Sequence, residues 1–252
     1  MTADRWTQAV RTQLGLGRLL PLGGPGDGAW IAEPAVAGAL RRAVQGARGV
    51  RLGALRLGLA DADEAAEAVV PAPPSALPPG ALRITGDCAA TAEEPLPVAA
   101  DRLRAGLVEA AERVGLVVAE VDLRVTGLLD EADQADQVAE EKGEAESGSV
   151  AEPPSPSPSS AASSDDAERV AEAVLGVPGV SRLTGALGGL GRAVHIEDQP
   201  GGASLPRRHV RVEVAVSADA RTIEVTGAVR AAVAKALPNN PTVAVLVTDL
   251  TT

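Results

Sequence analysis

The side chains best able to do chemistry are few in this 252-residue chain: the histidines His195 and His209, and the single cysteine Cys88. A nucleophilic thiol needs a partnered base, and a zinc site needs several ligands at regular spacing. The histidines lie in or beside predicted strands, and the cysteine lies far away in the other half of the chain. We therefore predict no catalytic residue, no metal ligand and no cofactor-binding residue, and interpret all three as structural.

Two other motifs invite a binding interpretation. The carboxylates of Asp61, Asp63, Glu64 and Glu67 lie in an alanine-rich loop without a shaping glycine, a pattern more typical of a solvated surface than of a cation site. The glycine run at 185–191, GALGGLG, has no Lys-Ser/Thr after it and no strand before it, so it fits neither phosphate-binding fingerprint. We predict a flexible connection between a helix and a strand.

Charge is concentrated in one segment. The formal net charge is −11, and the stretch from Asp130 to Glu168 alone holds twelve acidic residues and one lysine. The remainder of the chain is formally neutral, so neither half has the net basic footprint that nucleic acid binding requires. Arg207, Arg208 and Arg211 form the only basic cluster, and a nucleic-acid-binding module stays open as an alternative.

The same acidic segment marks a domain boundary. Residues 130–165 are acidic first and then rich in proline and serine, so they cannot bury enough apolar area to offset the entropy of ordering. We predict a disordered, extended linker; its Ser-Pro pairs at Ser155 and Ser157 fit phosphorylation sites and linker composition equally well. A second proline-rich spacer, Ala65 to Gly80, predicts a long loop inside the first half.

The two halves repeat one pattern of periodicity. Val210, Val212, Val214 and Val216 alternate with more polar residues, which indicates a strand with one wet face. Similar alternation and four-residue spacing give helix, strand, strand, helix, strand in each half. The predicted segments are 31–45, 55–59, 82–85, 103–114 and 121–125 in the first half, and 165–175, 194–196, 210–216, 225–237 and 243–247 in the second.

This order predicts an α+β fold with two α-β-β-α-β modules, each a two-layer sandwich of a three-stranded sheet with its helices on one face. The modules should span residues 30–129 and 166–252. The segment 1–29 should form a short helix around Trp6 and a glycine-rich loop at residues 15–28. Because each module is small and lacks Phe and Tyr, we expect the halves to pack on each other or on another copy. The sheet edges could also pair with a partner.

Composition also bounds the location. No apolar run approaches the roughly 20 residues that span a bilayer, and the start of the chain lacks a signal-peptide pattern. One cysteine excludes an internal disulfide framework and fits a reducing compartment. We expect a cytoplasmic protein without a transmembrane segment.

The second half resembles the bacterial alkaline shock, or envelope stress response, family. The resemblance rests on residues 170–180 (VAEAVLGVPGV), the strand 210–216, the helix 223–237 and the closing strand 243–248. The first half looks like a divergent copy through residues 31–50 and 117–125. Actinobacterial chains with a similar start are sometimes labelled as the nucleopolyhedrovirus p-ten family.

The resemblance implies a non-enzymatic stress-response protein that acts as a self-associating scaffold or binding module. It also implies recruitment to the inner face of the cell membrane by a small anchor protein. The family offers no catalytic residues to carry over. This chain departs from it in having two modules, an acidic linker and a proline-rich spacer. The same order of elements occurs in ring-building modules of secretion and sporulation machines, so a ring-building assembly component is a further alternative.

Overall fold

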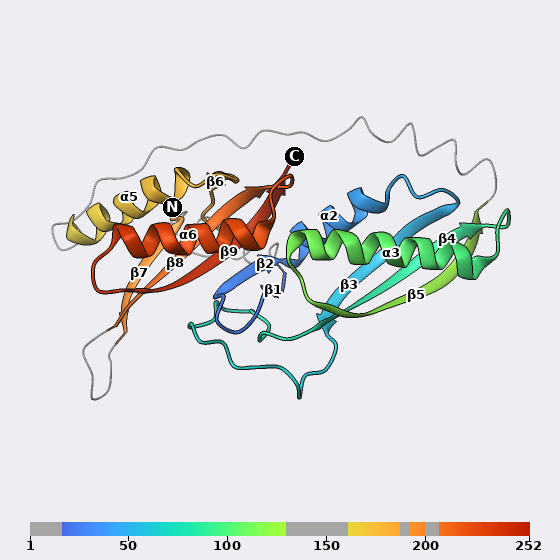
Figure 1. The fold of residues 1–252 in the computed structure, drawn as a ribbon, viewed down its shortest axis with the longest axis horizontal. Helices are drawn as coiled ribbons and strands as arrows, with labels where there is room; N and C mark the ends of the chain where they lie inside the picture. Colours follow the sequence, from blue (N-terminus) through green and yellow to red (C-terminus); the bar gives the residue numbers. More distant parts are fainter. Residues whose placement is uncertain (1–16, 130–160, 187–191, 200–206) are drawn as a thin grey trace, which may run out of the picture.

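The computed structural model describes residues 17–129, 161–186, 192–199 and 207–252. Figure 1 shows two sandwich units side by side, with the helices along the same face of both sheets. The elements are β1 (Leu19–Leu22), β2 (Ala29–Ala32), α2 (Glu33–Val44), β3 (Val50–Leu59), β4 (Leu82–Thr91), α3 (Leu96–Val114), β5 (Val118–Leu129), α5 (Ala161–Leu175), β6 (Val180–Leu183), β7 (Val194–Gln199), β8 (Arg207–Ser217), α6 (Thr222–Ala236) and β9 (Thr242–Thr251).

Module 1 (residues 33–129) has the predicted three-stranded sheet, in the order β3-β4-β5. The central strand β4 is antiparallel to β3 and parallel to β5. Helices α2 and α3 cover one face, where Leu57, Ile84, Leu103 and Leu107 are almost completely buried. Aliphatic side chains at period two on the strands and near period four on the helices build this core, so the predicted α+β sandwich is confirmed.

Module 2 (residues 161–252) repeats this plan around β8, which is antiparallel to β6 and β7 and parallel to β9. Strands β6 and β7 together take the place of β3, which has a bulge between Leu52 and Leu55. The glycine run 185–191 lies between β6 and β7, at the position where β3 has its bulge. It therefore connects two strands, and the prediction of a helix-to-strand connection is wrong; its residues 187–191 lie outside the described part of the chain.

Residues 19–32, which precede module 1, belong to the sheet of module 2. The glycine-rich loop predicted for residues 15–28 is wrong at 19–22, which form β1, and the first helix begins at Glu33 rather than Ile31. Strand β2 is antiparallel to β1 and parallel to β9, where Val245 N donates to Gly28 O at 2.9 Å. Among the described residues, the sheet of module 2 thereby has six strands instead of three, and the predicted boundary at residue 30 cuts through β2.

The proline-rich spacer is a loop, as predicted, but it packs against β1. Leu19 N donates to Ser75 O at 3.1 Å, and Leu77 N donates to Leu19 O at 2.8 Å. Together β1, β2, β9 and this loop bury Leu19, Trp30 and Leu246 in a second small core on the sheet face opposite the helices. The expectation of one wet face is therefore wrong for this part of module 2.

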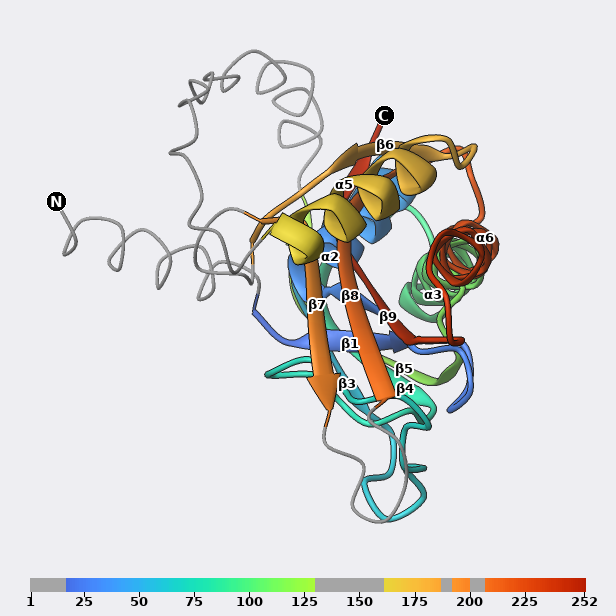
Figure 2. The same ribbon diagram turned by 90° about the vertical axis from the view of Figure 1, so that its left-hand side faces the viewer.

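The two modules contact each other, which is one of the two packings expected from sequence. Figures 1 and 2 show α3 and α6 in line, with the C-terminal end of α3 meeting the N-terminal end of α6. Gly115, just after α3, lies against Ile223 in the first turn of α6. This arrangement aligns the two helix dipoles head to tail. Arg42 of α2 adds a cross-module bond, with Nη2 donating to Leu250 O at 3.3 Å.

Other predicted segments are only partly described. Helix α5 begins at Ala161, four residues before the predicted helix 165–175, so residues 161–164 of the predicted linker are helical. The remaining predicted linker, 130–160, and the predicted N-terminal helix around Trp6 lie outside the described residues. Within the ranges that the structure describes, no helix has both the length and the apolar composition to cross a bilayer.

Candidate functional site

The most buried charge in the described part of the chain is Glu213 of β8, whose side chain is fully buried. It faces away from the helices, and Ala186 N donates to its Oε2 at 2.6 Å. Its Oε1 lies 3.9 Å from Arg211 Nε and 3.9 Å from His195 Nε2. Sequence reasoning missed this residue, because valine alternation assigned it to a wet face that residues 184–186 cover.

The two histidines lie on neighbouring strands but do not form one site. His195 Nε2 is 2.8 Å from Arg192 O, and His209 Nδ1 is 2.9 Å from Thr242 Oγ1. In the β7–β8 register His195 is opposite Arg211, and His209 is opposite Glu197. Each ring is thus held by its own local partner, and the two rings are not opposite each other.

Both histidines should make the protein less stable in mild acid. Burial is the main cause that lowers the pKa of His195 and of His209 below the usual 6.5. The folded state then binds fewer protons than the unfolded state, so this stability is complete above pH 6.5 and falls as the pH drops below it. We expect the urea midpoint to decrease between pH 7.5 and pH 5.5.

The control is the double variant His195→Gln/His209→Gln, which removes every histidine of the chain. Its urea midpoint should change much less over the same pH interval. An equal decrease in both proteins would show that other groups cause the effect.

Cys88 lies in module 1, on β4, with only 2% of its surface exposed. Burial is the main cause that raises the pKa of its thiol, and the neighbouring Asp87 raises it further. A thiol of raised pKa carries less of the reactive thiolate at neutral pH. The structure therefore keeps Cys88 packed in the sheet of module 1, whereas both histidines lie in the sheet of module 2.

The remaining polar motifs do not assemble into a binding centre. Asp61, Asp63, Glu64 and Glu67 are all exposed. No group of three or more His, Cys, Asp or Glu side chains in the described ranges is arranged to hold a metal ion. The four carboxylates therefore stay at the solvated surface that their loop composition indicated.

The basic cluster is largely matched by carboxylates. Arg208 Nη1 lies 2.7 Å from Asp166 of α5, and its Nε lies 3.4 Å from Asp198 of β7. Arg211 lies near the buried Glu213. The side chain of Arg207 is outside the described residues. Opposite charges at these distances reduce the local positive potential that phosphate binding would need.

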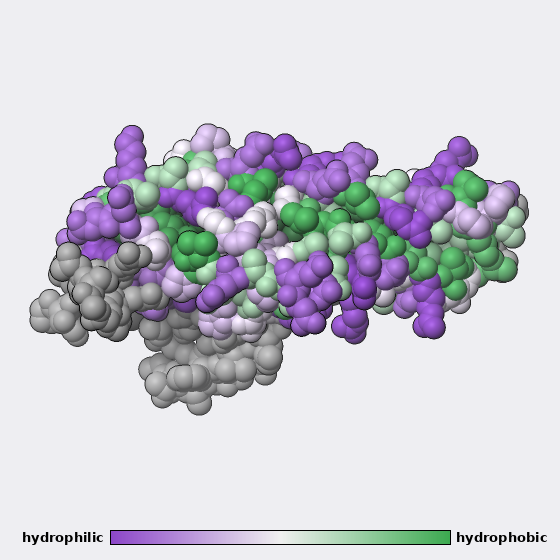
Figure 3. All heavy atoms as spheres, turned by 60° about the horizontal axis from the view of Figure 1, so that its bottom comes forward, coloured by the Kyte–Doolittle hydropathy of each residue, from purple (hydrophilic) through white to green (hydrophobic). Residues whose placement is uncertain are grey.

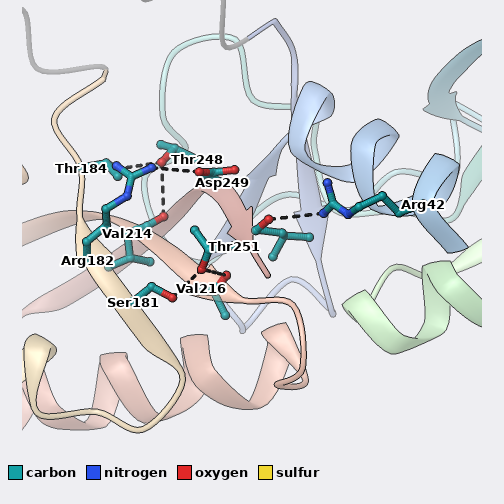
Figure 4. Close-up of polar contacts among 10 residues, drawn as sticks. Arg42, Ser181, Arg182, Thr184, Val214, Val216, Thr248, Asp249 and Thr251 are labelled. Carbon is teal, nitrogen blue, oxygen red and sulfur yellow. Dashed lines mark hydrogen bonds and ion pairs between the residues drawn. The ribbon is translucent and has the colours of Figure 1, made fainter. Parts of the chain in front are cut away.

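A cavity of about 270 Å³ lies at the module junction, between α2, α3 and the turn that leads into α6. Its lining is mainly alanine and includes Arg42, Arg113 and Asp219, but neither histidine and no cysteine. Arg42 is bonded to Leu250 O, and Arg113 Nη2 donates to Glu109 Oε1 at 2.9 Å. Figure 4 shows how the Arg42 contact adjoins a group of polar contacts between β6 and β9. The lining lacks a nucleophile with a base.

The remaining candidate is an edge of the module 1 sheet. Within the described ranges β5 pairs only with β4, whereas its counterpart in module 2, β9, pairs with β8 on one side and β2 on the other. Val117, Val125 and Leu128, on or beside β5, are 53%, 37% and 64% exposed. Figure 3 shows hydrophobic residues (green) among hydrophilic ones (purple) over the module 1 half of the face drawn. An open strand with exposed apolar side chains can accept another strand.

Searches for related proteins return no assignment: no family model, no curated protein and no solved structure matches this chain.

Proposed function

We propose that this protein is a non-enzymatic scaffold that binds a partner strand along β5. The observation that carries the proposal is the difference between two equivalent edges. In module 2 the β9 edge is occupied by β2 of the same chain, and in module 1 the β5 edge pairs with no described strand. A module of this fold can therefore accept an added strand beside its last strand, and in module 1 the edge of β5 has no described partner.

The backbone of β5 is suited to this role. Leu82 N donates to Val117 O at 2.7 Å, and the β4–β5 register then directs the N–H and C=O groups of residues 120, 122 and 124 toward β4. The groups of Val121, Leu123 and Val125 point to the open edge. Arg104 of α3 partly covers this edge, because its Nε donates to Val121 O at 3.2 Å. A carbonyl oxygen has two lone pairs and can accept a second bond from an added strand.

The resemblance to the alkaline shock family extends the proposal to the physiology. It supports a role in the envelope or general stress response, with recruitment to the membrane by a small anchor protein. Quantifying the protein in membrane and soluble fractions before and after alkaline stress tests this part. An unchanged amount and an unchanged distribution would remove it.

The edge itself is tested in cells by crosslinking and mass spectrometry on the full chain. Val125→Lys places a charge on the open edge, which should prevent strand addition and remove the crosslinked partners. Val98→Lys is the matched control, because Val98 is also half-exposed but lies on α3. Identical partner sets for the wild type and both variants would contradict the proposal.

A further inference from the structure

We propose that the strand received by β5 is the β5 strand of a second copy of this chain, antiparallel to it and related by a two-fold axis at Leu123. This inference rests on the proposed function in one respect, because both use the open edge of β5. It goes further because it specifies the partner and the register. A two-fold contact requires a strand that is complementary to itself, and β5 meets that requirement.

The backbone allows this pairing. Antiparallel strands exchange hydrogen bonds between residues whose groups point at each other. With the axis at Leu123, Leu123 is opposite its own copy and Val121 is opposite Val125. The groups of all three point to the open edge, as the β4–β5 register requires. The pairs between them, which include Asp122 opposite Arg124, are non-hydrogen-bonded positions, where facing side chains come closest.

The charges of β5 select this register. With the axis at Leu123, Asp122 faces Arg124 of the second copy and Arg124 faces Asp122, which gives two opposite-charge pairs in one interface. An axis at Asp122 would place two aspartates opposite each other, and an axis at Arg124 would place two arginines opposite each other. An axis at Val121 would place Glu120 opposite Asp122. Like charges directly opposite in a sheet are destabilising.

The side chains involved are accessible. Asp122 and Arg124 are both exposed in the single chain. Arg83 of β4 lies 2.5 Å from Glu120 and 3.6 Å from Asp122, so its main ion pair is with Glu120. The Asp122 carboxylate can therefore meet an arginine from another chain without breaking the shorter pair.

The apolar side of the same strand favours the contact as well. Val121, Leu123 and Val125 lie on the helix-facing side, where Val121 is buried, Leu123 is half-buried and Val125 is 37% exposed. In the proposed register Val125 packs on Val121 of the second copy, and the two leucines meet at the axis. The pairing would thus join two three-stranded sheets into one and cover apolar surface that the single chain leaves open.

Charge reversal tests the inference on the purified full chain by sedimentation and light scattering. The wild type should be a dimer. Asp122→Arg and Arg124→Asp should each weaken it by at least about tenfold in Kd, because both pairs in the interface become like-charged. Asp63→Arg makes the same charge change in an exposed loop and should leave the dimer intact.

Mixing the two weakened variants gives the sharpest result. In a mixed dimer the β5 strand of the Asp122→Arg chain carries arginine at both positions, and that of the Arg124→Asp chain carries aspartate at both. Each arginine then faces an aspartate across the axis, so the opposite-charge pairs return. The mixture should therefore dimerise where each variant alone does not, with circular dichroism showing that both variants are folded.

Three outcomes would overturn the inference: a monomeric wild type, reversal variants that dimerise as well as the wild type, or a mixture that stays monomeric. The proposed function fails separately. A monomeric wild type whose partners in cells are still lost in Val125→Lys would remove the second copy as the partner and retain the edge as a binding site.

Discussion

Trp30→Ala is expected to lower the free energy of unfolding by about 3–5 kcal/mol, the range found for removing a large aromatic side chain from a core. Trp30 is 1% exposed and packs with Leu19 and Leu246 in the small core of module 2. Its Nε1 donates to Leu77 O at 3.2 Å, so the side chain also holds the proline-rich loop. Urea unfolding followed by far-ultraviolet circular dichroism measures the change without relying on tryptophan fluorescence.

Two controls separate the contributions of Trp30. Trp30→Phe keeps much of the buried volume and loses the bond to Leu77 O, so it should cost less than Trp30→Ala. Val69→Ala removes a side chain that is 75% exposed in the same loop, and it should change stability by less than about 0.5 kcal/mol. A loss below about 1 kcal/mol in Trp30→Ala would contradict the position of β2 inside module 2.

Gly115→Val is expected to cost about 2–5 kcal/mol. Gly115 has φ +97°, a conformation that a β-branched residue adopts only with strain. An added Cβ would also lie 2.7 Å from Ile223 Cβ, so the contact between α3 and α6 would have to open. Equilibrium unfolding in urea measures the loss of stability.

A second substitution distinguishes the two causes of the Gly115→Val loss. In Gly115→Val/Ile223→Gly the Cβ and Cγ2 atoms that the new side chain would meet are absent, and the backbone strain at residue 115 remains. The losses of stability in Gly115→Val and Ile223→Gly should therefore add up to more than the loss in the double variant. Gly46→Val is the matched control, because no atom lies within 4 Å of a Cβ built there. If Gly46→Val and Gly115→Val cost the same, the junction would not be a packed contact.

Most of the repeat could be predicted from sequence because its signal is local. The valines of β8 and β9 alternate, and those of α6 recur every four residues, so the period alone separates strand from helix. The last three elements agree closely with their predictions: β8 extends beyond the predicted 210–216, α6 ends at Ala236, one residue before Leu237, and β9 contains the predicted 243–247. Strand β6, with only four residues, was not predicted. In the three elements that agree, local periodicity and tertiary packing favour the same structure.

Strands β1 and β2 could not be predicted in the same way. Each has four residues, which is too short for alternation to appear, and β1 contains Pro21. Proline is tolerated there because β1 is the outermost strand of the sheet. These residues form strands because β2 pairs with β9, at the far end of the chain, and β1 pairs with β2. No local pattern records the contact with β9.

The buried Glu213 was missed for a related reason. Its position on β8 is polar in a valine alternation, which locally indicates solvent. The covering backbone comes from the insertion between β6 and β7, which lies at the position where β3 of module 1 has its bulge. When residues inserted elsewhere in the chain bury one face of a strand, the hydrophobic alternation of that strand does not show it.

Strand β2 extends the sheet of module 2 beyond β9, so that residues 19–32 and β9 near the end of the chain form one folded unit. Amide hydrogen exchange at Val245 tests this claim most directly, because this N–H donates to Gly28 O. The structure predicts that the Val245 amide exchanges as slowly as the amides of the central strand β8. Exchange of Val245 at the rate of an unprotected edge, while β8 remains protected, would contradict the claim.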